Sequence, residues 1–117
     1  MSNNPILRPW GNYKTVDSGK GYQIKILTIN PKSSLSLQYH DHRAEHWVVI
    51  SGEGFAVHKN TDSEISIKIG SHIGIQKRDI HRLINRSQKE LIIAEIQLGK
   101  VISEEDIVRL EDEYGRV

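Results

Sequence analysis

The 117-residue chain contains no cysteine, which excludes both a disulfide framework and a metal site built from thiolates. A metal ion would therefore have to be held by imidazole, carboxylate or amide groups, and that ligand set suits Zn, Mn, Fe, Co or Ni. Aromatic residues are also scarce, at 6%, beside 37% hydrophobic residues. This composition fits a compact soluble protein, and the length predicts one domain over residues 1–117.

An excess of either charge is also absent. The 16 Lys and Arg residues are interspersed with 15 Asp and Glu residues, so no basic field is available for nucleic acid and we expect no such partner. No apolar run approaches the roughly 20 residues that span a bilayer, and residues 1–6 lack the charged and apolar regions of a signal peptide. We expect a cytoplasmic protein without a membrane partner.

Short runs of alternating or β-branched residues recur along the chain, separated by turn-forming segments, and predict an antiparallel all-β fold. Strands are expected over residues 22–29, 35–40, 46–50, 55–58, 65–69, 73–75, 82–84 and 91–97. The tail differs, because Ser103 followed by Glu104 and Glu105 is typical of a helix N-cap with acidic residues in the first turn. We therefore expect a short C-terminal helix.

Metal-competent side chains are concentrated between residues 38 and 52. Gln38 and His40 alternate along one expected strand, Glu45 follows after a short break, and His81 returns from a distant strand. All four can converge inside a β-barrel. A single inward histidine is more often a hydrogen-bonded core residue, but four ligands in this arrangement favour a site for one divalent metal ion.

The spacing Gln38-x-His40-x4-Glu45-x6-Gly52 resembles the first cupin motif, with glutamine where many cupins carry histidine. The resemblance implies a cupin-type double-stranded β-helix, also called a jelly-roll barrel. It also implies that these polar residues bind metal together with a histidine from a second motif.

The second cupin motif is similar to the segment from Gly70 to Asn85, in which His81 is the ligand. Gln76 and Arg78 stand where proline and glycine are usual. These departures affect the turn before His81 and leave the ligand itself in place.

A narrower resemblance is to the type II phosphomannose isomerase (mannose-6-phosphate isomerase) cupin domain, found at the C-terminus of mannose-1-phosphate guanylyltransferases. No Gly-rich loop precedes the cupin, so we expect a free-standing isomerase domain without sugar-nucleotide synthesis. The segments that carry the resemblance cover nearly the whole chain and are 8–13 (RPWGNY), 35–52, 81–85 (HRLIN), 95–99 (EIQLG) and 105–116 (EDIVRLEDEYGR).

This resemblance implies a metal-dependent aldose–ketose isomerase that interconverts mannose 6-phosphate and fructose 6-phosphate through an enediol. The divalent ion, with zinc favoured over Mn, Co, Ni and Fe, would stabilise negative charge on the sugar oxygens. Two alternatives stay open: a non-catalytic cupin that binds a sugar phosphate or another metabolite, and a different metal-dependent cupin enzyme such as a dioxygenase or epimerase.

Strand parity places further polar side chains in the cavity. His42, Lys25 and Glu95 are the candidates for moving the proton, and Gln97 is a candidate substrate contact. For His42 two alternatives stay open, namely a further metal ligand and a solvent-facing loop position. The substrate phosphate is assigned to the guanidinium groups beside the ligands. These belong to Arg43 and to Arg82, which we place at the cavity rim.

The remaining aromatic and histidine residues have structural assignments. Trp10 and Trp47 are expected as core or interface anchors. His46 is expected to point away from the metal, and His58 and His72 to lie on the surface. The N-terminal arm with Trp10 predicts a homodimer, because a sandwich of this size must cover its strand edges.

Overall fold

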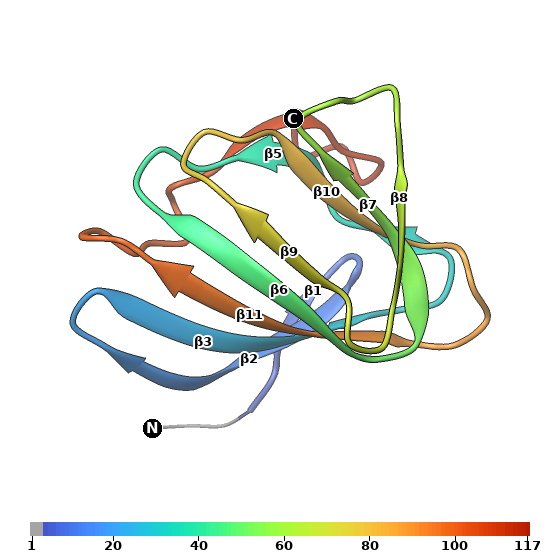
Figure 1. Ribbon diagram of the computed structural model, residues 1–117, viewed down its shortest axis with the longest axis horizontal. Coiled ribbons are helices and arrows are strands. Elements are labelled where there is room, and N and C mark those ends of the chain that lie inside the picture. Colours follow the sequence, from blue (N-terminus) through green and yellow to red (C-terminus); the bar gives the residue numbers. More distant parts are fainter. Residues whose placement is uncertain (1–3) are drawn as a thin grey trace.

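The computed structural model describes residues 4–117, and this part of the chain forms strands and turns without a helix (Figure 1). None of it forms a helix long and apolar enough to cross a bilayer. Residues 1–3, which entered the signal-peptide argument, lie outside the described residues. The strands are β1 (Ile6–Arg8), β2 (Gly11–Gly19), β3 (Tyr22–Ile29), β4 (Ser33–Ser34), β5 (Leu37–Tyr39), β6 (Ala44–Ser51), β7 (Glu53–His58), β8 (Ile65–Lys68), β9 (His72–Ile75), β10 (His81–Asn85), β11 (Leu91–Leu98) and β12 (Val108–Glu111).

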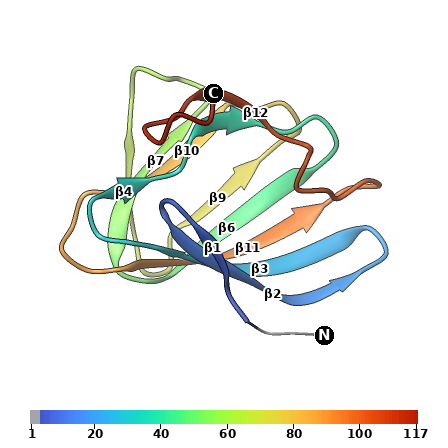
Figure 2. The ribbon, with the colours of Figure 1, turned by 180° about the vertical axis from the view of Figure 1, so that it is seen from behind.

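Two antiparallel sheets form the molecule (Figures 1 and 2). The first sheet has the order β1-β2-β3-β11-β6-β9, and the second has the order β12-β5-β10-β7-β8 with β4 also paired to β10. Strands far apart in sequence are therefore neighbours, as β11 is to both β3 and β6. This arrangement confirms the predicted double-stranded β-helix, and each run expected as a strand overlaps one.

The interior changes from apolar to polar along the strands. The inward side chains of β11 begin with Leu91 and Ile93 and continue with Glu95 and Gln97, and all four are buried. The neighbouring strand β6 is antiparallel to β11, so its inward residues run in the opposite order, from Glu45 to Trp47 and Val49. One end of the sandwich is consequently an aliphatic core, and the other end collects buried polar groups.

The predicted C-terminal helix is wrong. The Ser103 hydroxyl does accept the Glu105 amide, as a helix N-cap would, but the turn ends there. The Asp106 carboxylate is drawn to the backbone amides of Asp41 and His42, and the next residues pair with β5 as β12. Backbone pairing with an open sheet edge thus replaces the hydrogen bonds within a helix, because tertiary contacts override a weak local propensity.

The motif residue Asn85 joins three segments of backbone at the apolar end. Its amide nitrogen donates to the carbonyls of Ile29, Asn30 and Lys89 at 3.0, 3.1 and 2.8 Å, and its oxygen accepts from the Ser87 amide and hydroxyl. The side chain is 1% exposed. It therefore satisfies buried backbone groups that water does not reach.

We predict that Asn85→Ala lowers the free energy of unfolding by about 1–3 kcal/mol, because it leaves buried carbonyls without donors. Urea unfolding measures this change. The matched control is Asn60→Ala, which alters an exposed loop residue and should change stability by less than about 0.5 kcal/mol. Equal losses in the two variants would show that the Asn85 network is not the cause.

The outer face of the first sheet carries exposed apolar side chains from β6 and β11, including Val48, Ile50, Ile96 and Leu98. Trp10 does not serve as an arm for a neighbour, because its side chain is already buried in its own chain, at 6% exposed. The expectation for Trp10 as a dimer contact is therefore corrected to a core role.

Homodimerisation itself stays a prediction. We expect light scattering at tens of micromolar to give about twice the chain mass of 13.4 kDa, because pairing would remove exposed apolar surface from water. Ile96→Glu should shift the measured mass towards one chain. A wild-type mass of a single chain at the same concentration would end this prediction.

Candidate metal centre

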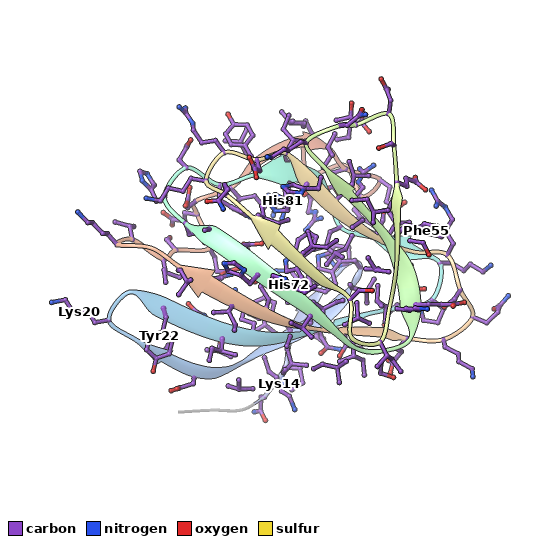
Figure 3. The ribbon with its side chains drawn as sticks, in the orientation of Figure 1. Lys14, Lys20, Tyr22, Phe55, His72 and His81 are labelled. Carbon is purple, nitrogen blue, oxygen red and sulfur yellow. The ribbon has the colours of Figure 1, made fainter. Side chains whose placement is uncertain are left out.

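Three predicted ligands meet at the polar end of the sandwich. His40 follows β5, Glu45 lies on β6, and His81 begins β10. Each offers one ligand atom, and these atoms lie within 4.8 Å of one another. The Glu45 carboxylate approaches His40 Nε2 at 3.2 Å with Oε2 and His81 Nε2 at 3.7 Å with Oε1. Figure 3 labels His81 within the sandwich, where it is 1% exposed.

Backbone carbonyls orient both imidazole rings. His40 Nδ1 lies 2.6 Å from the Asp106 carbonyl and His81 Nδ1 lies 2.8 Å from the Asp79 carbonyl. A carbonyl only accepts, so each Nδ1 carries the proton and each Nε2 has a lone pair. The Nε2 of His81 has no hydrogen-bond partner among the described residues, and the Nε2 of His40 accepts a long hydrogen bond of 3.4 Å from Arg43. Metal-binding histidines are held in this way in proteins, with the second ring nitrogen donating to a carbonyl or carboxylate.

Unpartnered polar atoms show that the cluster fits a cation. Among residues 4–117, Glu45 Oε1, His81 Nε2 and Gln97 Oε1 are buried without a hydrogen-bond partner. All three are electron-pair donors and line or adjoin the same space, since Gln97 is the cross-strand partner of Glu45. Leaving such atoms unpaired is costly, and a divalent ion bound to imidazole and carboxylate would compensate them.

Gln38, the fourth predicted ligand, is buried beside this cluster. It pairs across strands with His81, so the two side chains share one face of the second sheet. Its amide oxygen accepts a hydrogen bond from the Ser36 hydroxyl at 2.6 Å. An amide oxygen has two lone pairs, so Gln38 keeps one for an ion.

Burial keeps both imidazoles neutral. Burial first, and then the charge of a protonated His40, lower the pKa of His81 to about 4. Burial also lowers the pKa of His40, with the Arg43 guanidinium adding to the effect. Neutral imidazole is the form that binds metal, so both rings are ready to do so at neutral pH.

The turn before His81 keeps its geometry despite the unusual residues. Arg78, which stands where glycine is usual in the motif, has φ of +67°, in the left-handed region that favours glycine. Its amide donates to the His40 carbonyl at 2.7 Å. The turn thereby ties the two motifs together.

A cavity of about 100 Å³ adjoins the cluster. Both sheets and the C-terminal segment contribute to its walls. The residues that line it are Arg8, Trp10, Tyr13, Lys25, Leu27, Leu35, Gln38, His40, Arg43, Glu45, Glu95, Gln97, Glu104, Ile107, Arg109 and Arg116.

Four of the additional site residues predicted by parity or position do face this cavity, namely Lys25, Arg43, Glu95 and Gln97. Lys25 forms an ion pair with Glu104 and lies over the Tyr13 ring. Arg43 donates from Nε to Glu45 at 2.9 Å and from another nitrogen to the Ser103 carbonyl. Arg43 is therefore committed to holding the ligand Glu45 and the C-terminal segment.

Glu95 is a buried acid between Trp47 and Gln97. It accepts the Trp47 indole N–H at 3.2 Å and the Gln97 amide at 2.7 Å. Burial raises the pKa of Glu95 to about 7, and the neighbouring Glu45 carboxylate raises it as well. In the metal-free protein this carboxyl is therefore close to half protonated at neutral pH.

The prediction that His42 faces the cavity is wrong, because its side chain is exposed. Strand parity does not extend to this residue, since β5 ends at Tyr39 and the chain bends through Asp41 and His42. The Asp106 carboxylate holds this bend by accepting both backbone amides.

The prediction that Arg82 lies at the cavity rim is also wrong. Arg82 is on the opposite face of β10 from His81, where its guanidinium donates to the carbonyls of Leu35 and Glu111. Successive side chains of β10 alternate between its two faces as in a regular strand. Arg82 therefore hydrogen-bonds to backbone carbonyls outside the cavity.

His46 and His72 lie apart from the centre, as predicted, whereas His58 is only 18% exposed and is the cross-strand neighbour of His81. His46 and His72 stack with Nδ1 and Nε2 3.1 Å apart on the outer face of the first sheet, and Figure 3 labels His72 there. His58 pairs with Asp79 at 2.9 Å. Both tryptophans are core residues.

The cavity also contains charged residues that the sequence had not assigned to a site: Arg8, Glu104, Arg109 and Arg116. The sequence did contain a signal for these residues. They lie in or beside segments 8–13 and 105–116, which carry the family resemblance but whose residues had been given no function. The expected C-terminal helix hid this signal, because a helix over these residues would not pair with β5 and would not bring Arg109 beside the metal ligands.

A double-stranded β-helix that converges two histidines and a glutamate from these two motifs is a cupin. More specifically, the chain belongs to the family described as mannose-6-phosphate isomerase C-terminal, which matches residues 2–112. Family membership was therefore predicted correctly.

Over the aligned segment, curated relatives are identical to the chain at about two fifths of the positions. The chain is 42% identical over 111 residues to the alginate biosynthesis protein AlgA of Pseudomonas aeruginosa. It is 41% identical to the xanthan biosynthesis protein XanB of Xanthomonas campestris and 40% identical to the mannose-1-phosphate guanylyltransferase ManC of Salmonella typhimurium. Each alignment covers 95% or 96% of this chain and 23% of the relative. The chain thus spans about a quarter of their length.

Solved structures show the same fold at low identity. A Klebsiella pneumoniae protein with a double-stranded β-helix domain superposes with a TM-score of 0.74 at 17% identity, covering 96% of this chain and 89% of that one. Bacillus subtilis oxalate decarboxylase, whose structure concerns its Mn(II) centres, superposes with a TM-score of 0.76 at 20% identity. The match covers 91% of this chain and 29% of that one. These likenesses concern the fold.

The relatives overturn the predicted activity. We expected a free-standing mannose-6-phosphate isomerase unconnected with sugar-nucleotide synthesis. The named relatives are instead mannose-1-phosphate guanylyltransferases and alginate and xanthan biosynthesis proteins, and the match covers about a quarter of each. The isomerase assignment is therefore wrong, and the enediol chemistry assigned to His42, Lys25 and Glu95 is withdrawn with it.

Glu95 generates a pH-dependence that a variant can isolate. Its pKa rises from 4.5 to about 7 on folding, so the stabilisation from its neutral form is complete below about pH 4.5 and is lost as pH rises through 7. Glu95→Gln has no proton to lose. The metal-free variant should therefore gain stability over wild type between about pH 5 and about pH 8, by at most about 3 kcal/mol.

Urea unfolding in the presence of a chelator measures this difference. Burial lowers the pKa of His81 to about 4 and the Glu95 charge acts against this shift, so the comparison is made above about pH 5, where His81 is neutral in the folded form of both proteins. A stability difference that does not change with pH would contradict the raised pKa of Glu95.

Proposed function

We propose that this domain binds one divalent metal ion and, beside it, a small sugar phosphate that it holds without isomerising. The observation that carries the proposal is the set of buried, unpartnered donor atoms on Glu45, His81 and Gln97. Glu45 and Gln97 line a cavity whose walls are mostly polar or charged, and His81 lies beside Glu45 at its inner end. Such a site suits a cation and a ligand rich in hydroxyl groups.

The metal would be held by His40 and His81 through Nε2, by Glu45 and by Gln38. Bound there, a divalent ion supplies a fixed positive charge that attracts ligand oxygens. Zinc remains the proposed ion, because two imidazoles with a carboxylate are a ligand set that it favours. Manganese is the principal competitor for an oxygen-rich version of the same set.

The sugar phosphate is proposed from two sources. The relative from Salmonella is named for mannose 1-phosphate, and the cavity offers hydrogen-bonding groups on Lys25, Glu95 and Gln97. At about 100 Å³ the cavity is smaller than the roughly 300 Å³ at which pockets begin to enclose drug-sized ligands. The sugar would therefore be only partly enclosed, with its remainder at the cavity mouth.

Metal analysis tests the first half of the proposal. Protein purified without chelator should contain about one equivalent of zinc or manganese, and His81→Ala should lose it, because removing one ligand typically lowers metal affinity strongly. His72→Ala is the matched control, since it removes an exposed imidazole from the outer face. Full metal content in His81→Ala would contradict the assignment.

Calorimetric titration of the metal-loaded protein tests the second half. Mannose 1-phosphate should bind more tightly than mannose, and chelation should weaken binding, because the ion and the cationic groups both attract ligand oxygens. A coupled assay with mannose 6-phosphate should show no fructose 6-phosphate. Equal affinity for mannose and its phosphate, or turnover in the coupled assay, would contradict the proposal.

A further inference from the structure

The cavity mouth holds a group of arginines outside the metal cluster. Arg8 precedes the core residue Trp10, and Arg109 and Arg116 come from the C-terminal segment. All three line the cavity. Figure 2 shows how this segment crosses from the end of β11 in the first sheet to β12 at the edge of the second.

These cations differ in how they are paired. The Arg116 guanidinium is bound by the Asp112 carboxylate through two hydrogen bonds of 2.7 and 3.0 Å. Arg8 donates to the Leu7 carbonyl and to the Tyr13 hydroxyl, which are both neutral. The side chain of Arg109 has no hydrogen bond and no ion pair within residues 4–117, and its Nε is buried without a partner. Among the described residues, no carboxylate therefore forms a direct ion pair with Arg8 or Arg109.

Mutual repulsion adds to the cost of this arrangement. The pKa of Arg109 is lowered first by burial and then by the charge of Arg116, with Arg8 adding to the effect, while the carboxylates of Asp112 and Glu104 oppose it in part. Arg109 is only partly buried, but a partly desolvated guanidinium without a contacting carboxylate is still less favourable than one that an anion compensates. A bound anion at the mouth of the cavity would therefore be stabilised by these arginines.

An acid of the chain already lies beside this position. Glu104 lines the cavity and is paired with Lys25, and although burial raises its pKa, Lys25, Arg43 and Arg8 lower it below its usual value. Its side chain is half exposed and comes from a turn, so it is free to move. Glu104 shows that the cavity mouth accepts an anionic oxygen.

Strand register sets the distance from the mouth to the metal cluster. His81 on β10 pairs with Gln38 on β5, and Gln38 pairs with Arg109 on β12. The three residues form one row across the second sheet. Neighbouring strands are about 4.8 Å apart, so the backbones of His81 and Arg109 are roughly 10 Å apart. A single sugar ring bridges such a gap.

We infer that Arg109 and Arg8 form an anion site that takes the phosphate of a monosaccharide monophosphate whose hydroxyl groups face the metal cluster. The inference rests on the proposed function for the identity of the ligand. It moves phosphate recognition from Arg43 and Arg82, which are committed to Glu45 and to backbone carbonyls, to the arginines without a direct ion pair among the described residues.

Titration calorimetry on the metal-loaded full chain tests it with mannose 1-phosphate, mannose and inorganic phosphate. Arg109→Ala should bind mannose 1-phosphate about 10- to 100-fold more weakly, the effect of one lost charged hydrogen-bonding group, with unchanged metal content and unchanged mannose affinity. Arg109→Lys should lose less affinity, because lysine keeps the positive charge although it lacks the planar guanidinium that binds a phosphate with two hydrogen bonds. Arg86→Ala, which removes a surface arginine outside this cavity, is the matched control and should bind as wild type.

Glu104→Gln is expected to change affinity in the opposite direction, tightening mannose 1-phosphate binding several-fold because it removes a competing anion. It also keeps the inference testable should Arg109→Ala fold poorly. Wild-type affinity in Arg109→Ala with metal retained, or no tightening in Glu104→Gln, overturns the anion site and leaves the proposed function intact. Failure of wild type to bind mannose 1-phosphate overturns the proposed function. Binding of inorganic phosphate that is lost in Arg109→Ala would then still support the anion site.

Discussion

The buried carboxylate of Glu45 is the constraint on which the polar end of this molecule depends. It is 1% exposed, and one oxygen is compensated by Arg43 while the other has no partner among the described residues. A charge in such a place must be offset by nearby cations. The two imidazoles with their lone pairs directed inward define a position where a metal ion would supply that charge. Arg43, the carbonyls that orient the rings, and the unpartnered atoms all follow from this requirement.

The C-terminal segment completes the site and links it to the fold. Asp106 accepts from the backbone beside the ligands and, through its carbonyl, orients His40. The same segment adds Glu104 and Arg109 to the cavity wall. Ligand geometry and the cationic mouth are consequently built by one stretch of chain, so a change in its docking would affect both. This dependence explains why the family resemblance extends into a region with no metal ligand.

Much of the fold and of the metal cluster was predictable, because both depend on short-range periodicity. A strand exposes alternate residues to opposite faces, so Gln38 and His40 were expected on one face, and Glu45 and His81 followed from their spacing. The inward positions of Lys25, Glu95 and Gln97 rest on the same rule. It fails where a strand ends: His42 lies three residues beyond Tyr39, and its parity no longer holds.

The amino-acid sequence by itself determined the strands, the family and the identity of the metal-competent residues, because these depend on residue type and local spacing. The tertiary structure alone decided that Ser103–Glu105 begins a turn before an edge strand, that Arg82 braces the outer face, and that Arg109 lies in the same row as His81. These outcomes depend on which strand edge is open and on which distant backbone groups need partners. Pairing between segments some 70 residues apart is decided by those requirements, which no local pattern encodes.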